Sequence, residues 1–208
     1  MTRLFSIGVA VLVVAPLLFV PAVGCKANQG SFDLKVRDWE EQIGHRNPNV
    51  RRRAAEQAQR LPLAKVRGLL WNVLKYDDDN ETVGRAAATL GEMLRNEGAP
   101  SKSDVDALLI AFDRVGEFYA RGRAAVALGR ISDKLSPALI DRVIKTFIAW
   151  LDNVSGDAER YVAEALGMFG GRAKTAIPAL EALRKRHKWE QTRTAATDAI
   201  NVIKGASR

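Results

Sequence analysis

The sequence repeats one pattern of small and apolar residues five times, and this repetition constrains the fold more than any other feature. The copies read VRRRAAEQAQ, TVGRAAATLG, ARGRAAVALG, AERYVAEALG and TRTAATDAIN, and they begin at Val50, Thr82, Ala120, Ala158 and Thr192. The starting positions lie 32, 38, 38 and 34 residues apart, a period that is typical of stacked helical repeats. One such unit cannot bury its apolar face alone, so each copy must present the same small-residue contact to the next.

A second amphipathic segment follows each of the first four copies, at residues 62–77, 103–115, 136–152 and 176–189. Ser136 followed by Pro137 predicts an N-cap and a first helical residue, and Pro178 marks another helix start. The sequence SKSD at 101–104 fits a capping box. Helix-favouring residues dominate the chain, and the period-two alternation of strands is hard to find after residue 30. We therefore predict an all-α fold of helix–turn–helix units.

The phasing Val-Arg-x-x-Ala-Ala-x-x-Leu-Gly, followed by a longer apolar helix, resembles the HEAT-repeat family and its short HEAT-like variants over residues 48–204. The resemblance implies a right-handed α-solenoid of about four to five HEAT-like repeats. It also implies a repeat domain at 32–208 that opens on a helix at 32–45. The first copy lacks the closing Leu-Gly, as expected of a capping unit. The family's second position holds arginine in three copies and another residue in two, namely Arg51, Arg121 and Arg193 against Val83 and Glu159.

The N-terminal segment has the pattern of an export signal. Arg3 precedes an uncharged run at 4–24 that ends in small residues, which is typical of a secretory signal peptide. We therefore predict that residues 1–24 are a signal peptide and that residues 25–31, which are mostly polar, form a tether.

Cys25 is the only cysteine in 208 residues, and it directly follows this run. The segment PAVGC resembles the lipobox of bacterial lipoproteins; Gly24 fits that pattern, whereas Ala22 is smaller than the residue usual at its place. The resemblance implies lipidation of Cys25 and a membrane-anchored lipoprotein on the extracytoplasmic side of the bacterial cell envelope. A soluble secreted protein and an uncleaved membrane anchor are the alternatives, although Pro16 and Pro21 interrupt a continuous helix there.

The chain offers little that suits catalysis. His45 and His187, the two histidines, lie far apart in the sequence, and we interpret them as solvated surface residues. The acidic run at 76–81 lacks the glycine and the closing carboxylate of a calcium loop, and we interpret it as a turn that caps the following helix. The glycines at 167–172 follow a helix and suit a turn. We therefore predict no enzyme activity, no cofactor and no metal site.

The charge pattern suggests where a partner binds. Lys and Arg outnumber Asp and Glu by 32 to 24, for a net charge of +8, which admits an anionic partner. In the HEAT family the second helices line the concave surface, so the resemblance implies that a protein partner binds there. The cationic contacts expected on this surface are Arg67, Arg142, Lys145, Arg184 and Lys188, and the candidate anchors are Trp71 and Trp150.

The sequence thus predicts a non-catalytic protein-interaction or scaffold module, tethered to an envelope membrane. One alternative is the binding of nucleic acid in a basic groove, against which the export signal argues. Another is the binding of an anionic polymer or a membrane surface through the same helices, with an affinity that falls as salt is added. A further alternative is an accessory role of the chromophore-lyase kind, since some of those proteins have HEAT-like repeats. No residue in this sequence indicates a bilin site.

Overall fold

The computed structural model describes residues 35–114, 118–153 and 158–205, and within these ranges every regular element is a helix. The prediction of an all-α chain is confirmed for these ranges. The predicted signal peptide, Cys25 and the tether lie outside them. No helix in the described ranges is long and apolar enough to cross a bilayer.

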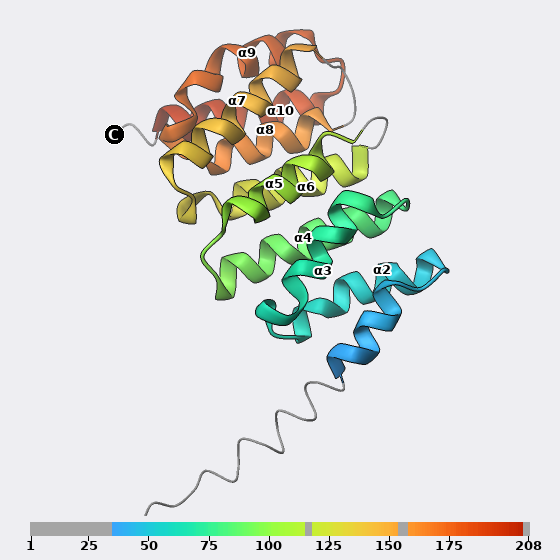
Figure 1. The fold of residues 1–208 in the computed structure, drawn as a ribbon. Helices are drawn as coiled ribbons and strands as arrows, with labels where there is room; N and C mark the ends of the chain where they lie inside the picture. Colours follow the sequence, from blue (N-terminus) through green and yellow to red (C-terminus); the bar gives the residue numbers. More distant parts are fainter. Residues whose placement is uncertain (1–34, 115–117, 154–157, 206–208) are drawn as a thin grey trace, which may run out of the picture.

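The even-numbered helices form one row of the molecule. Successive members of this row pack against each other along much of their length, and Figure 1 shows the helices stacked in chain order from the blue end to the red end. The five copies of the repeated segment coincide with these helices. The row consists of α2 (Pro48–Gln57), α4 (Asn80–Glu97), α6 (Phe118–Arg130), α8 (Glu159–Met168) and α10 (Glu190–Gly205).

The odd-numbered helices form a second row. Each of them packs against the even-numbered helix that follows it in the chain. Neighbours within this second row contact each other less extensively than neighbours within the first row do. The row consists of α3 (Leu63–Tyr76), α5 (Lys102–Phe112), α7 (Pro137–Asn153) and α9 (Ile177–Arg186). A helical segment at 35–43 precedes α2. Three short 3₁₀ helices complete the described elements: η1 (Ala58–Arg60), η2 (Ser132–Lys134) and η3 (Gly170–Ala176).

The predicted helix starts are confirmed by their caps. In the capping box of α5, the Ser101 hydroxyl accepts a hydrogen bond from the backbone of Asp104, whose carboxylate accepts one from the Ser101 backbone N–H. Asp79 caps α4 by accepting a hydrogen bond from the backbone N–H of Thr82 at 2.8 Å. Helix α9 has Pro178 in its first turn, where a missing N–H costs no helical hydrogen bond.

The glycine that closes three copies of the repeat sits where neighbouring even-numbered helices touch. A Cβ added to Gly91 would lie 2.7 Å from Cβ and 2.9 Å from Cα of Ala127 on the next helix. At Gly129 and Gly167 the corresponding closest Cα atoms lie at 3.1 and 3.3 Å. The repeated Leu-Gly therefore brings two backbones into contact, which is the packing role that the sequence predicted.

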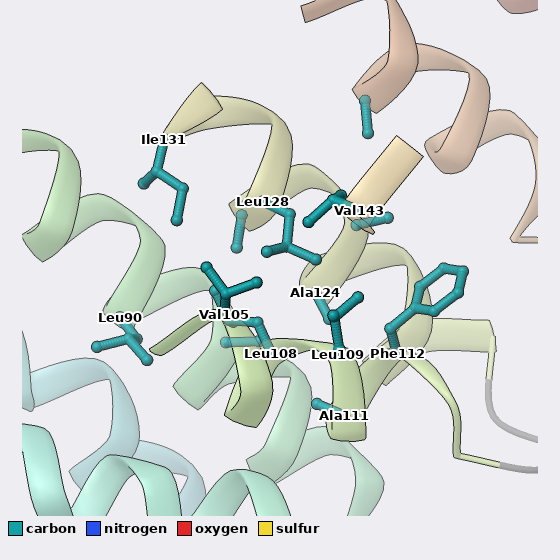
Figure 2. Packing of buried hydrophobic residues seen from close by; sticks show 14 of the residues in the cluster. Leu90, Val105, Leu108, Leu109, Ala111, Phe112, Ala124, Leu128, Ile131 and Val143 are labelled. Carbon is teal, nitrogen blue, oxygen red and sulfur yellow. The ribbon is translucent and has the colours of Figure 1, made fainter. Parts of the chain in front are cut away.

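Larger side chains pack within the odd-numbered row and between the two rows. The ring centroids of Phe112 on α5 and Phe147 on α7 lie 4.9 Å apart, and Phe169, which follows α8, lies 6.4 Å from Phe147. Figure 2 shows Leu128 of α6 and Val143 of α7 in the same cluster of buried apolar side chains as Phe112. The even-numbered row thus supplies small residues to its own contacts, and the bulk of the core fills the space between the rows.

The helix contact at Gly91 gives a stability prediction. Gly91→Ala should lower the free energy of unfolding by about 1–3 kcal/mol, because the new methyl group must displace the backbone of Ala127. Gly68→Ala on α3 is the matched control: an added Cβ there meets nothing within 4 Å. The control should be stabilised by about 0.5–1 kcal/mol through helix propensity alone. Urea denaturation followed by circular dichroism measures both, and equal effects of the two substitutions would contradict the close approach.

Candidate functional site

Two of the expected binding residues are engaged with a buried carboxylate. Asp104 is fully buried, and Arg67 donates to it from Nε at 2.9 Å and from Nη2 at 2.5 Å. The indole N–H of Trp71 donates to the same carboxylate at 2.9 Å. The Ser101 hydroxyl adds a further hydrogen bond at 2.7 Å. Arg67 and Trp71 therefore join α3 to α5 and have little left to offer a partner.

The pKa of Asp104 reflects this environment. Burial on its own would raise it, but the hydrogen bonds from Arg67, Ser101 and Trp71 favour the carboxylate and hold the pKa below its usual range. The group is thus an ionised, internally compensated anchor of the fold, and its perturbation signals structural rather than catalytic use.

The remaining expected cations are spread over α7, α9 and the turn that follows α9. Arg142 forms an ion pair with Asp106 of α5. Lys145, Arg184 and Lys188 are exposed, and the Lys188 ammonium lies 5.5 Å from the ring centroid of Trp189. Since acids neutralise Arg67 and Arg142, the basic groove expected along the second helices is reduced to these three exposed side chains.

Trp150 does not fit the expectation of an exposed anchor. It is 8% exposed, and its ring packs against Phe112 with centroids 5.7 Å apart. The guanidinium of Arg121 lies 5.1 Å from the Trp150 ring centroid. Burial in the core takes Trp150 away from any partner. Trp189, which was not among the expected anchors, is 46% exposed.

The interpretation of His187 as a solvated residue is wrong. Its Nε2 lies 2.9 Å from the carboxylate of Glu159, which is fully buried, and its Nδ1 accepts a hydrogen bond from the Trp189 backbone. A neutral imidazole protonated at Nε2 satisfies both contacts. Arg186 binds the other Glu159 oxygen at 2.8 Å. His45, by contrast, is exposed, and its Nδ1 accepts from the backbone of Asn47 in the same local pattern.

The acidic run at 76–81 is a turn, as predicted. Asp77 receives hydrogen bonds from Arg51 at 2.9 and 3.0 Å, and Asp79 receives two from Arg52 at 2.8 and 2.6 Å. The bonds from Arg52 hold the pKa of Asp79 well below its usual value. Each of these carboxylates is thereby paired with an arginine of the preceding repeat. Within the described ranges no cluster of acids, histidines or cysteines is arranged to hold a metal ion.

The arginines at the repeat's second position have a role that sequence reasoning missed. Arg51 donates to the carbonyl oxygens of residues 45 and 46, and Arg193 to those of residues 187 and 188. Arg121 donates to the carbonyls of residues 112 and 114. Each side chain thus closes the turn that precedes its own helix. The carbonyls that these arginines bind lie five to nine residues earlier in the chain. The available signal was therefore an arginine one turn into a helix that follows a turn with unpaired carbonyl groups.

Ion pairs and tyrosines also join neighbouring helices of the even-numbered row. Arg85 of α4 pairs with Glu56 of α2 and with Glu81, and Arg130 of α6 pairs with Glu92 of α4. The rings of Tyr119 and Tyr161 lie over glycines of the preceding helix. A Cβ added to Gly84 would lie 2.6 Å from the nearest ring atom of Tyr119, and a Cβ added to Gly122 would lie 2.6 Å from the nearest ring atom of Tyr161.

A cavity opens at the last interface of this row, between α8 and α10. Its volume is about 850 Å³, within the range of sites that bind small molecules or large side chains. The apolar side chains of Met168 and Val202 contribute to its wall and are 42% and 52% exposed. Charged and polar residues line the rest of it, among them Arg160, Glu190 and Asp198. None of the residues proposed from the sequence lines this cavity.

No protein-family model matches the chain, and no curated protein sequence matches it. Among solved structures it is similar to an engineered protein whose crystal structure was determined by the Northeast Structural Genomics Consortium. The two share 16% sequence identity, and the match covers 82% of this chain and 98% of the other, with a TM-score of 0.48.

The buried Asp104 cluster predicts a large loss of stability on truncation. Asp104→Ala should cost about 3–5 kcal/mol, because Arg67 then keeps a partly buried charge without its partner. Asp106→Ala is the matched control on the same helix: it breaks only the more exposed pair with Arg142 and should cost less than about 1 kcal/mol. Chemical denaturation of both variants measures the difference, and a small effect of Asp104→Ala would contradict its anchoring role.

The same cluster predicts how stability depends on pH. Because the pKa of Asp104 is lowered in the folded protein, its stabilisation is complete above the unfolded-state pKa of about 3.9. It is lost as the pH falls through the lower folded-state pKa. Between neutral and acidic pH, Asp104→Asn should therefore lose less stability than the unmodified chain, which repeated denaturation across that range will show.

Proposed function

We propose that this protein is a non-catalytic interaction module: a short right-handed α-solenoid of HEAT-like repeats, exported and tethered to the cell envelope by lipid at Cys25. It binds a protein partner on the face formed by the even-numbered helices. The observation that carries the proposal is the cavity between α8 and α10, because it exposes apolar surface on a face that ion pairs and tyrosines otherwise close.

The spacing of the helices supports this choice of face. In a stack of helix pairs, the row whose members stand closer together lies on the inside of the curve. The even-numbered helices meet through glycine and alanine, down to 2.9 Å between an added Cβ of Gly91 and Cα of Ala127, and the odd-numbered helices contact each other less. The concave face is therefore assigned to the first helix of each repeat, and not to the second helices as the family resemblance implied.

The chemistry of the odd-numbered helices supports the same choice. Of the seven binding residues expected there, Arg67, Trp71 and Arg142 are engaged with acids, and Trp150 is buried. This weakens the alternative of a basic groove for nucleic acid or another anionic polymer. The exposed Lys145, Arg184 and Lys188 leave a smaller cationic surface, whose binding of such a polymer would decrease as salt is added.

The tether rests on the sequence. A lipid on Cys25 would hold the repeat domain near a membrane through the short polar segment that follows it. A single acyl chain gives only weak membrane binding, whereas the diacylglycerol of a lipoprotein supplies two chains and stable anchoring. A tethered module acts on partners at high effective concentration along that membrane.

Site-specific photocrosslinking tests the proposed binding face. A photoreactive phenylalanine analogue replaces Met168 or Val202 on the even-numbered row, or the 44% exposed Ile110 of α5 as a matched control. We expect a discrete protein adduct from the first two positions and none from the third when the chain is irradiated in the cells that produce it. An adduct from Ile110 alone would move the binding face to the odd-numbered row.

The mass of the N-terminal peptide tests the tether. Protein from the envelope fraction of a bacterial host with lipoprotein processing should begin at Cys25 and carry a diacylglycerol, with a further acyl chain on its amino group in many hosts. Cys25→Ser should block this processing and release the mature domain from the membrane or leave the signal uncleaved. An intact Met1 on soluble protein would overturn both export and lipidation.

A further inference from the structure

We infer that the cavity between α8 and α10 binds an aromatic side chain presented by a basic segment of the partner protein. This inference rests on the proposed function and specifies the chemistry of the partner. It follows from what two neighbouring interfaces of the even-numbered row contain at the same place, and from the charges around the cavity.

An aromatic ring occupies the equivalent place in two preceding interfaces. Tyr119 lies over Gly84 between α4 and α6, and Tyr161 lies over Gly122 between α6 and α8. Arg123 stacks on Tyr119 with its guanidinium carbon 5.2 Å from the ring centroid, while Arg160 does so on Tyr161 at 4.3 Å. In both interfaces a flat ring fills the groove that the small residues leave open at the surface.

The last interface lacks this ring. When the repeats are aligned on their starting residues, the positions of Tyr119 and Tyr161 correspond to Gln191 and Ala195 of α10. Both of these residues line the cavity, together with Arg160. Arg160 stands where the second and third copies have Gly84 and Gly122. The cavity is therefore the space of a missing tyrosine, and an aromatic ring from outside can fill it and stack on Arg160 as the chain's own tyrosines do.

The charges around the cavity favour cations beside that ring. Glu190 and Asp198 line it and form no ion pair within the ranges that the structure describes, while Glu164 is already paired with Arg160 at 2.8 Å. This acidic rim belongs to a chain whose net charge is +8. Lysine or arginine residues flanking the aromatic anchor complement the rim, and such complementarity selects partners and speeds their association.

A second copy of the chain is the competing occupant. Trp189 is 46% exposed and follows the basic run 184–188, so it has some of the required chemistry. It lies directly before Glu190, however, so its insertion into another copy would bring the two basic runs toward each other. Repulsion between them favours a different protein as the source of the aromatic anchor.

The test uses the full-length chain, ¹⁵N-labelled in neutral detergent, and a synthetic peptide with one tyrosine flanked on each side by two lysines. Saturable amide shifts centred on Arg160, Gln191 and Ala195, at peptide concentrations below about 1 mM, are expected. Replacing the peptide's tyrosine by alanine, or its lysines by glutamates, should abolish them. The double variant Glu190→Lys and Asp198→Lys should weaken binding about fivefold or more, whereas Asp141→Lys on α7 should leave it unchanged.

A plug variant tests the missing ring directly. Ala195→Tyr places an aromatic side chain at the position that corresponds to Tyr161, and it should prevent peptide binding while the protein remains folded. If this substitution disturbs folding, the charge-reversed variant of Glu190 and Asp198 still tests the site. Absence of binding, or equal binding of the lysine and glutamate peptides, would overturn the inference. Self-association lost on Trp189→Ala would overturn it in favour of a second copy.

The two proposals fail separately. Partner adducts through Met168 or Val202 without binding of the lysine–tyrosine peptide would leave the interaction module standing and remove the basic aromatic partner. Peptide binding at the cavity without any partner adduct in the producing cells would support the chemistry of the site and count against its use as the partner-binding face.

Discussion

The structure depends on the close approach of the even-numbered helices. Gly91, Gly129 and Gly167 each place backbone against the alanine of the next helix, and no larger residue fits without moving it. The contact is the same at three successive interfaces, so each helix is positioned relative to its neighbour by one steric rule. Since each repeat contacts chiefly its neighbours, the stability of the array is approximately the sum of such interfaces.

Polar contacts at the turns also fix how neighbouring repeats sit against each other. Arg51 binds the turn before its own helix and also Asp77 in the next turn, so one guanidinium joins two repeats. Glu159 takes the same position in the fourth copy, and its buried carboxylate is compensated by His187 and Arg186 of the following turn. Burial of a charge is costly unless it is paired, and this explains why His187, which the sequence analysis interpreted as a solvated residue, packs beside Glu159 together with Arg186.

The sequence did not indicate which partner a long side chain would choose. Periodicity places Arg67 and Trp71 on one face of α3, but both side chains turn to Asp104, which lies on another helix and is recognisable in the sequence only as a capping residue. The α8–α10 cavity was missed because it arises from an absent tyrosine. Its detection requires knowing that Tyr119 and Tyr161 lie on glycines of the neighbouring helix, which is a contact between segments far apart in the chain.

The sequence by itself determined the helical class, the positions of the helices that carry the repeated segment, the caps at Asp79 and Ser101, and the packing role of the Leu-Gly pair. These features are local, because hydrophobic period and capping chemistry act within one or two helical turns. Only the tertiary structure decided which charges are neutralised, that Trp150 is buried while Trp189 is exposed, and where apolar surface remains open. Those properties depend on the distances between helices, and a helix pattern carries no information on which neighbour its side chains will meet.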